Sequence, residues 1–262
     1  MKIFKFGGAS VKDAVGVKNL VDVFKTVNNS DTLIVVSAMG KTTNILENII
    51  KTYFKNKNEV AVGILFLKEF HMEIINNLFQ VKNTDCEAEV NRLFEELQEF
   101  FKSNKSSNYS FIYDQVVSFG ELLSTKIIYY FMKFNEIDSL WLDARKCIKT
   151  DDYYRSAELN WELTQKNIVD MVEKHSIIIT QGFIGSDSNN FTTTLGREGS
   201  DYSAAIFAYA LNAESVTIWK DVPGVLNGDP RFFKNTKLLN QISYREAIEL
   251  AFYGASVIHP KT

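Results

Sequence analysis

A lysine stands in an apolar segment that runs directly into two glycines near the start of the chain. Lys5 lies between Phe4 and Phe6 in the sequence FKFGG. A buried ammonium group is costly unless an anion compensates it, and tandem glycines weaken the interior of a strand. A phosphate held by Lys5 and by backbone N–H groups of the glycine turn would account for both features. An exposed lysine on an edge strand, followed by an ordinary turn, is the alternative that this segment alone leaves open.

Other glycine-containing segments also follow apolar, strand-like runs. SAMGKTTN follows LIVV, QGFIG follows SIII, and TLGREGSDYSAA joins a strand pattern to a helix pattern. The carboxyl ends of the strands form the ligand crevice of an open α/β sheet, so we expect these segments to converge on one phosphate-binding site. Neither common nucleotide-binding loop explains them: GxGxxG is missing, and Val35 stands where the pattern GxxxxGK[ST] needs its first glycine.

Charged residues within these segments could bind an anionic ligand. The guanidinium of Arg197 suits bidentate capture of a carboxylate or phosphate. Ser200 and Asp201 read as a helix N-cap followed by a first-turn acid, for which a purely structural role is the alternative. Glu121 is a carboxylate on an otherwise apolar helix pattern, and a solvated surface position is the alternative there.

The segment WKDVPGVLNGDPRFF contains Pro-Gly, Asn-Gly and Asp-Pro turns directly after a strand pattern. A stiff loop at the carboxyl end of a sheet could form the wall of a nucleotide pocket, or it could be only a tight connection. Its charged residues are Lys220, Asp221, Asp229 and Arg231.

The elements expected to position these residues alternate between strand and helix. Residues 2–6 predict a strand, a helix follows with Ser10 as its N-cap, and residues 32–40 predict a second buried strand. Residues 42–134 are almost entirely helical in pattern, which predicts a lid or subdomain beside the sheet. The remaining expected elements are strands at 139–144, 176–185, 190–196 and 215–222, and helices near 160–174, 201–212 and 243–253. This order predicts an α/β fold with a parallel sheet covered by helices.

Composition excludes several other classes of protein. The 262 residues suit one α/β unit or two unequal lobes, and the net charge of −3 gives no general attraction for nucleic acid or anionic lipid. No apolar run approaches the roughly 20 residues of a membrane helix. Cys86 and Cys147 lie far apart without a CxxC pattern, so neither a zinc site nor a disulfide framework is indicated. We therefore expect a cytoplasmic protein without nucleic-acid or membrane partners and without a protein-bound metal site.

Seven segments in order closely resemble the aspartate kinases of the amino acid kinase superfamily. They are KFGGAS, VVSAMGKTTN, FGELLS, QGFIG, LGREGSDYSAA, WKDVPGVLNGDPR and YGASVIHP, and the likeness runs from residue 2 to residue 262. The first motif and the pattern G-R-x-G-S-D separate aspartate kinases from acetylglutamate, glutamate and uridylate kinases. The resemblance implies a three-layer α/β/α sandwich with a mostly parallel sheet. It also implies transfer of the ATP γ-phosphoryl group, with Mg²⁺, to L-aspartate, giving 4-phospho-L-aspartate for the synthesis of lysine, threonine and methionine.

The resemblance also implies roles for individual residues. Lys5 would hold the transferring phosphoryl group, and Asp201 would order the loop or assist at the substrate ammonium. Aspartate would be bound by Ser37, Thr43, Glu121 at its ammonium and Arg197 at its α-carboxylate. The nucleotide would be contacted by Lys5, Gly7, Gly8, Ser10, Lys220, Asp221, Leu226 and Arg231.

Three departures from the family pattern keep alternatives open. Ala9 and Glu198 replace a threonine and a glycine, and Ser256 stands where many relatives have a nucleotide-contacting lysine, whose charge Lys220 could supply. A non-catalytic amino-acid or nucleotide sensor and a kinase for another acidic amino acid are the rival hypotheses. The family motif at residues 258–260 leads into ACT regulatory domains and sometimes a homoserine dehydrogenase. We expect a catalytic domain cut from such a longer chain, without ACT domains and with a homodimer as one form of assembly.

Overall fold

A five-stranded parallel sheet forms the centre of the fold. The computed structural model describes residues 1–27, 31–79, 81, 83–173, 175–254, 258 and 262. The strand order is β3-β4-β2-β1-β7. Strands β1 and β2 are adjacent and inside the sheet, in agreement with their almost continuous burial. The strands are β1 (Lys2–Phe6), β2 (Thr32–Val36), β3 (Leu140–Leu142), β4 (Ile177–Gln181) and β7 (Ser215–Trp219).

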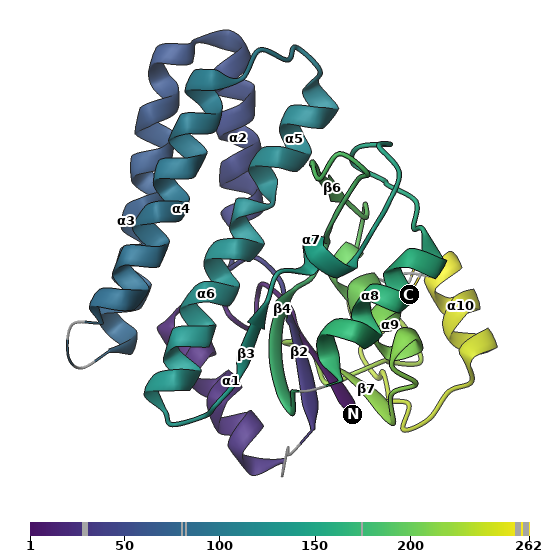
Figure 1. The fold of residues 1–262 in the computed structure, drawn as a ribbon. Coiled ribbons are helices and arrows are strands. Elements are labelled where there is room, and N and C mark those ends of the chain that lie inside the picture. The colour runs from purple at the N-terminus through teal and green to yellow at the C-terminus, as the bar shows by residue number, and fades with distance from the viewer. Residues whose placement is uncertain (28–30, 80, 82, 174, 255–257, 259–261) are drawn as a thin grey trace.

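Helices cover both faces of this sheet (Figure 1). Helices α1 (Ala14–Thr26) and α6 (Phe119–Phe134) lie on one face, and α8 (Trp161–Val172) and α9 (Gly199–Ala210) lie on the other. This division follows from right-handed crossovers, because the chain moves along the sheet in one direction through α1 and α6 and in the opposite direction through α8 and α9. The predicted three-layer α/β fold is confirmed.

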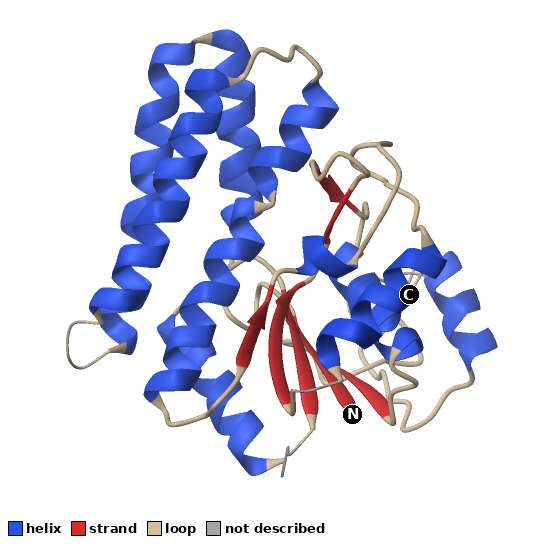
Figure 2. Cartoon of the chain, viewed as in Figure 1, coloured by secondary structure: helices blue, strands red, loops and turns tan. Residues whose placement is uncertain are grey.

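A group of helices extends beyond one end of the sheet (Figure 2). It comprises α2 (Thr42–Lys55), the 3₁₀ turn η1 (Lys57–Glu59), α3 (Val60–Leu78), α4 (Thr84–Ser103), α5 (Tyr109–Val117) and α6. The predicted helical character of residues 42–134 is confirmed, and a lid function for them stays a prediction. Within the described part of the chain, every helix falls short of the length or apolarity that crossing a membrane requires.

The predicted start of the first helix is wrong. Helix α1 begins at Ala14 rather than near Ser10, because the Asp13 carboxylate accepts the Gly16 N–H at 2.8 Å and caps the helix. The hydroxyl of Ser10 instead donates to the Trp219 carbonyl at 3.3 Å, next to the end of β7.

The expected strand at 176–185 is broken into two. After β4 the chain turns at Gly182 and Phe183, whose φ is 71°, and continues as β5 (Ile184–Ser186). Strand β5 pairs antiparallel with β6 (Thr192–Thr194) in a separate two-stranded sheet. The short helix α7 (Ala144–Cys147) was not predicted, while α10 (Tyr244–Phe252) was.

A buried histidine within the helical group should make the stability of the protein sensitive to acid. His71 on α3 is fully buried, its Nδ1 lies 2.8 Å from the Leu67 carbonyl, and burial lowers its pKa from 6.5 to about 4. Below pH 6.5 the unfolded chain takes up a proton at His71 that the folded chain does not, so the contribution of His71 to the free energy of unfolding falls as pH drops from 6.5 to 4. The loss should reach about 3 kcal/mol.

We therefore expect His71→Met, which cannot titrate, to flatten this part of the stability profile. Urea unfolding of both proteins at pH 7 and pH 4.5 measures the difference. An equally steep loss of stability in the variant would contradict the assignment.

Candidate active site

The carboxyl ends of β1 and β2 open into a pocket of about 640 Å³. Many of the predicted site residues meet there, although they come from distant parts of the chain. Those that line the pocket are Lys5, Gly8, Ser37, Thr43, Glu121, Arg197 and Asp201. The convergence of the glycine segments after β1, β2, β4 and β6 is therefore confirmed.

Lys5 is neither exposed nor on an edge strand, and its partner belongs to the protein. It is 5% exposed, and its Nζ lies 2.6 Å from Oδ1 of Asp201 in the first turn of α9. Lys220 approaches the other carboxylate oxygen, with its Nζ 3.0 Å from Oδ2. The structure thus corrects the sequence argument: the anion next to Lys5 in the folded chain is Asp201, and a phosphate would be an additional partner.

Strand register explains why the two lysines share one carboxylate. Lys5 is paired with Ile218 of the neighbouring parallel strand β7. Side chains two residues apart point to the same face of a sheet, so Lys220 follows Ile218 on the face that Lys5 occupies. Helix α9 packs on β1 and β7 and presents Asp201 there. The Asp201 carboxylate therefore holds two ammonium groups close together at one end of the pocket.

The turn after β1 lies so close to the loop after β2 that a side chain would not fit. A Cβ atom on Gly8 would lie 2.6 Å from the Ala38 carbonyl oxygen, and one on Gly7 would lie 3.3 Å from Nζ of Lys5. The backbones are joined by hydrogen bonds from Gly40 N to Gly8 O, at 3.0 Å, and from Ser37 N to Phe6 O, at 3.1 Å. Glycine is therefore required here for close packing.

Glu121 is buried, not a solvated surface residue. Its side chain lies in the first turn of α6, and Oε1 accepts the Ala38 N–H at 3.2 Å. Its Oε2 has no hydrogen-bond partner within the described ranges, and burial raises the pKa of Glu121 to about 8. A buried carboxylate oxygen without a donor is costly, so this position is suited to a cation that enters from solution.

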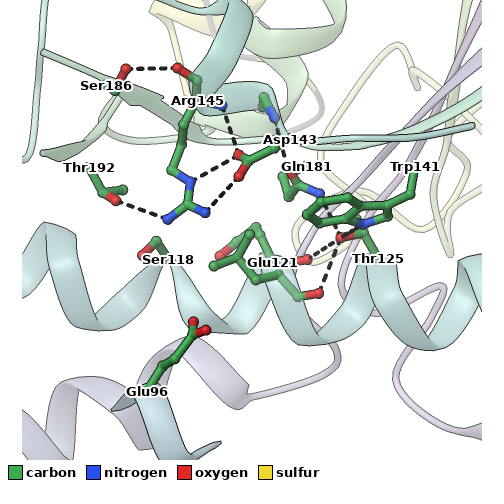
Figure 3. Close-up of polar contacts among 12 residues, drawn as sticks. Glu96, Ser118, Glu121, Thr125, Trp141, Asp143, Arg145, Gln181, Ser186 and Thr192 are labelled. Carbon is green, nitrogen blue, oxygen red and sulfur yellow. Dashed lines mark hydrogen bonds and ion pairs between the residues drawn. The ribbon is translucent and has the colours of Figure 1, made fainter. Parts of the chain in front are cut away.

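Hydrogen bonds fix the turn of α6 that carries Glu121 (Figure 3). The Thr125 hydroxyl accepts from Gln181 Nε2 at 2.8 Å and from Trp141 Nε1 at 3.0 Å, and it donates to the Glu121 carbonyl at 2.8 Å. Gln181 also accepts the Ala144 N–H at 2.8 Å through its Oε1. The ends of β3 and β4 are thereby tied to the helix.

The loop before α9 departs from its predicted details. Helix α9 begins at Gly199, so Ser200 lies inside the helix and the prediction that it is the N-cap is wrong. Glu198 is the N-cap and has a φ of 56°. This backbone conformation favours glycine, which is the residue that the family pattern has at this position. Arg197 precedes it and is exposed at the pocket.

Of the residues predicted to bind the nucleotide, Lys5 and Gly8 line this pocket. Leu226 and Arg231 line a second, mainly loop-built pocket of about 480 Å³ between residues 222 and 254. Arg231 is exposed and ion-paired with Asp229 at 2.6 Å, and Asp221 is exposed. Ser256 lies outside the described residues, so the proposed exchange of its charge with Lys220 stays a prediction. In the described ranges, His, Cys, Asp and Glu side chains do not gather in threes as a metal site would require.

Sequence reasoning missed several residues that also line the first pocket. They are Asn44, Tyr113, Arg155 and Phe183. Phe183 belongs to the QGFIG segment that was singled out, whereas Arg155 follows a polar stretch with no recognisable pattern.

Comparison with known proteins assigns the family. The family model described as "Amino acid kinase family" matches residues 1–262. The chain belongs to the amino acid kinase family. It is 34% identical over 264 residues to lysine-sensitive aspartokinase 3 of Escherichia coli (strain K12), a match that covers 99% of this chain and 58% of that relative.

Two further relatives of this amino acid kinase are informative. The bifunctional aspartokinase/homoserine dehydrogenase of Buchnera aphidicola subsp. Acyrthosiphon pisum (strain APS) is 31% identical over 274 residues, which is 100% of this chain and 33% of the relative. The solved structure of E. coli aspartokinase III with aspartate and ADP, in the R-state, matches with a TM-score of 0.90 at 31% identity. That match covers 100% of this chain and 58% of the other. The chain thus spans less than two thirds of the length of each relative.

The central ion pairs of this amino acid kinase lead to a prediction about stability. Asp201→Asn removes the carboxylate that pairs with Lys220 and with the almost fully buried Lys5, and should lower the free energy of unfolding by about 3 to 5 kcal/mol. Lys220→Met should cost less, because the pair between Lys5 and Asp201 remains. Urea unfolding at pH 7 measures both, and an Asn variant within about 1 kcal/mol of the wild type would refute this account of the ion pairs.

Proposed function

We propose that this chain is an aspartate kinase domain, which transfers the γ-phosphoryl group of ATP to the side-chain carboxylate of L-aspartate and gives 4-phospho-L-aspartate. The main support is the buried Oε2 of Glu121, which has no hydrogen-bond partner among the described residues and lies in the same pocket as the Lys5 ammonium. Such a pocket suits a ligand with an ammonium at one end and a negatively charged reacting group at the other. The aspartokinase relatives support the same substrate.

Each charged group of aspartate then has a complementary residue. Its ammonium would pair with Glu121, and its α-carboxylate would pair with Arg197. Ser37 and Thr43 line the same pocket and would donate hydroxyl hydrogen bonds. The side-chain carboxylate would face Lys5, next to the glycine turn after β1.

The chemistry requires little proton transfer. An aspartate side chain with a pKa near about 4 is already ionised at neutral pH, so no strong general base is needed. Catalysis would rest on alignment and on stabilisation of the charge that spreads over the phosphoryl oxygens. Lys5 would contact these oxygens, and Asp201 would act as a positioning residue that holds Lys5 and Lys220 in place.

The nucleotide would approach from the side of β7. Gly7, Gly8, Ser10, Lys220 and Asp221 would lie along its phosphates, and Leu226 and Arg231 would line its other end. Mg²⁺ would enter with ATP, since magnesium usually binds through phosphates with one or two carboxylates. Both oxygens of Asp201 already pair with lysines, so the exposed Asp221 fits this requirement better. The expected ACT domains and homodimer stay predictions.

A panel of acceptors tests the proposed function. With MgATP, ADP release should depend on L-aspartate far more than on glutamate or N-acetylglutamate, and hydroxylamine should trap the acyl phosphate as a hydroxamate. Preference for another acceptor would favour a related kinase. Nucleotide or amino-acid binding without any ADP release would favour a sensor.

Removing the charge of Lys5 should slow the chemical step. We expect Lys5→Met to lower kcat by about 10² or more, because the ammonium would stabilise charge in the transition state. Lys2→Met, on the same strand but at its amino end, is the matched control and should leave kcat unchanged. Steady-state kinetics with saturating aspartate and ATP decide the matter, and near wild-type turnover of the Lys5 variant would exclude this role.

The raised pKa of Glu121 predicts a pH-dependent affinity for aspartate. In the empty pocket the carboxyl group titrates near pH 8, so at lower pH it must release a proton before it can pair with the substrate ammonium. The KM for aspartate should therefore fall by up to about tenfold per pH unit as pH rises from 6.5 towards 8. The KM for ATP should change little.

In Glu121→Gln this dependence should disappear and the KM should be high throughout, because the amide carries no charge. Initial-rate measurements across this pH range test both expectations. A wild-type KM that is independent of pH would show that Glu121 does not receive the ammonium.

A further inference from the structure

Arg155 occupies a backbone conformation that is unfavourable for its side chain. It lies in the loop before α8, with a φ of 73°. A Cβ atom disfavours this left-handed region, which glycine adopts readily. Such conformations persist where surrounding contacts fix them, and they cluster at binding sites.

A buried carboxylate holds the backbone of Arg155 in place. The N–H of Arg155 donates to both carboxylate oxygens of Asp114, at 3.1 and 2.9 Å. Asp114 is fully buried on α5 and also accepts from the N–H and the hydroxyl of Thr194, each at 2.8 Å. The loop is thereby fixed between α5 and β6, and the direction of Arg155 is set by the fold.

The Arg155 side chain lies at the candidate active site. Its guanidinium carbon is 4.6 Å from the centre of the Tyr113 ring, and both residues line the first pocket. The Tyr113 hydroxyl donates to Glu47 at 2.9 Å, which fixes the ring under the guanidinium. No carboxylate of the described chain forms an ion pair with the Arg155 side chain.

The loop of Arg155 touches the loop of Arg197. A Cβ atom on Gly196 would lie 3.4 Å from the Arg155 carbonyl oxygen and 3.3 Å from the Ser156 hydroxyl oxygen. Arg155 and Arg197 therefore lie on adjoining loops, and both residues line the same pocket. Arg197 likewise lacks an ion pair with any carboxylate in the ranges described above.

We propose that Arg155 is a second binding residue for the α-carboxylate of the amino-acid acceptor and acts together with Arg197. This inference rests on the proposed function. Glu121 would take the ammonium and the Lys5 end of the pocket would take the reacting carboxylate, so the α-carboxylate is the remaining anion. Two guanidinium groups that form no ion pair with a carboxylate of the described residues match the two oxygens of that group. Arg155 would thus select acceptors with a free α-carboxylate.

The variant Arg155→Gly removes the side chain that would bind aspartate without destabilising the backbone at this position. Glycine adopts a φ of 73° without strain, so the variant should melt at the same temperature as the wild type or higher. Calorimetric titration should show an affinity for L-aspartate at least tenfold weaker, and kinetics should show a KM raised by the same factor with kcat within about threefold. Glu136→Gly is the matched control, because Glu136 is an exposed residue with a φ of 60° at the end of α6, outside the pocket.

The α-amide of aspartate tests which group Arg155 contacts. It keeps the ammonium and the side-chain carboxylate but has no α-carboxylate, so Arg155→Gly should not weaken its binding further. In the double variant with Arg197→Ala, the two losses of aspartate affinity should not add, because both residues contact one group.

An unchanged aspartate affinity in Arg155→Gly, or an equal loss for aspartate and its α-amide, would overturn the inference. The proposed function fails separately, if the wild-type protein binds aspartate but releases no ADP with it. In that case the titrations still decide whether Arg155 binds the α-carboxylate.

Discussion

The buried carboxylate of Asp201, held between the ammonium groups of Lys5 and Lys220, is the interaction on which the rest of the site depends. It joins β1, the chain beyond β7 and the first turn of α9. It explains how an ammonium group can lie inside a parallel sheet, because a charge can be buried when it is paired. It also holds the Lys5 ammonium at the pocket, where this charge would attract a phosphoryl group.

The helical group supplies the opposite charge. Helix α6 packs on the sheet through hydrogen bonds of Thr125 and brings Glu121 to the same pocket, where its Oε2 has no hydrogen-bond partner among the described residues. Helix α5 contributes Tyr113 and, through Asp114, directs Arg155. The pocket therefore has fixed positions for both signs of charge, as a zwitterionic dicarboxylate requires.

Local signals, namely apolar strand patterns and glycine turns, predict most of the strands, the α/β fold and several pocket residues, such as Lys5 and Arg197. The three-layer sandwich and the roles of Ser37 and Thr43 follow only from the family resemblance. The sequence does not predict the partner of Lys5, since the pair with Asp201 depends on the order of β1 and β7 in the sheet. The sequence also does not predict the burial of Glu121, because a glutamate on a helix is usually solvated. Arg155 carries no local signal, as its conformation is imposed by a distant carboxylate.

In the proposed reaction the pocket presents the side-chain carboxylate of aspartate, rather than water, to the γ-phosphoryl group. Aspartate labelled with ¹⁸O only in its side-chain carboxylate tests this directly. Hydroxylamine attacks the carbonyl carbon of the acyl phosphate, so the phosphate it releases keeps the bridging oxygen. The account predicts one ¹⁸O atom in each phosphate formed by this route. Phosphate without ¹⁸O, formed as fast as ADP, would mean that water is the acceptor and would contradict the account.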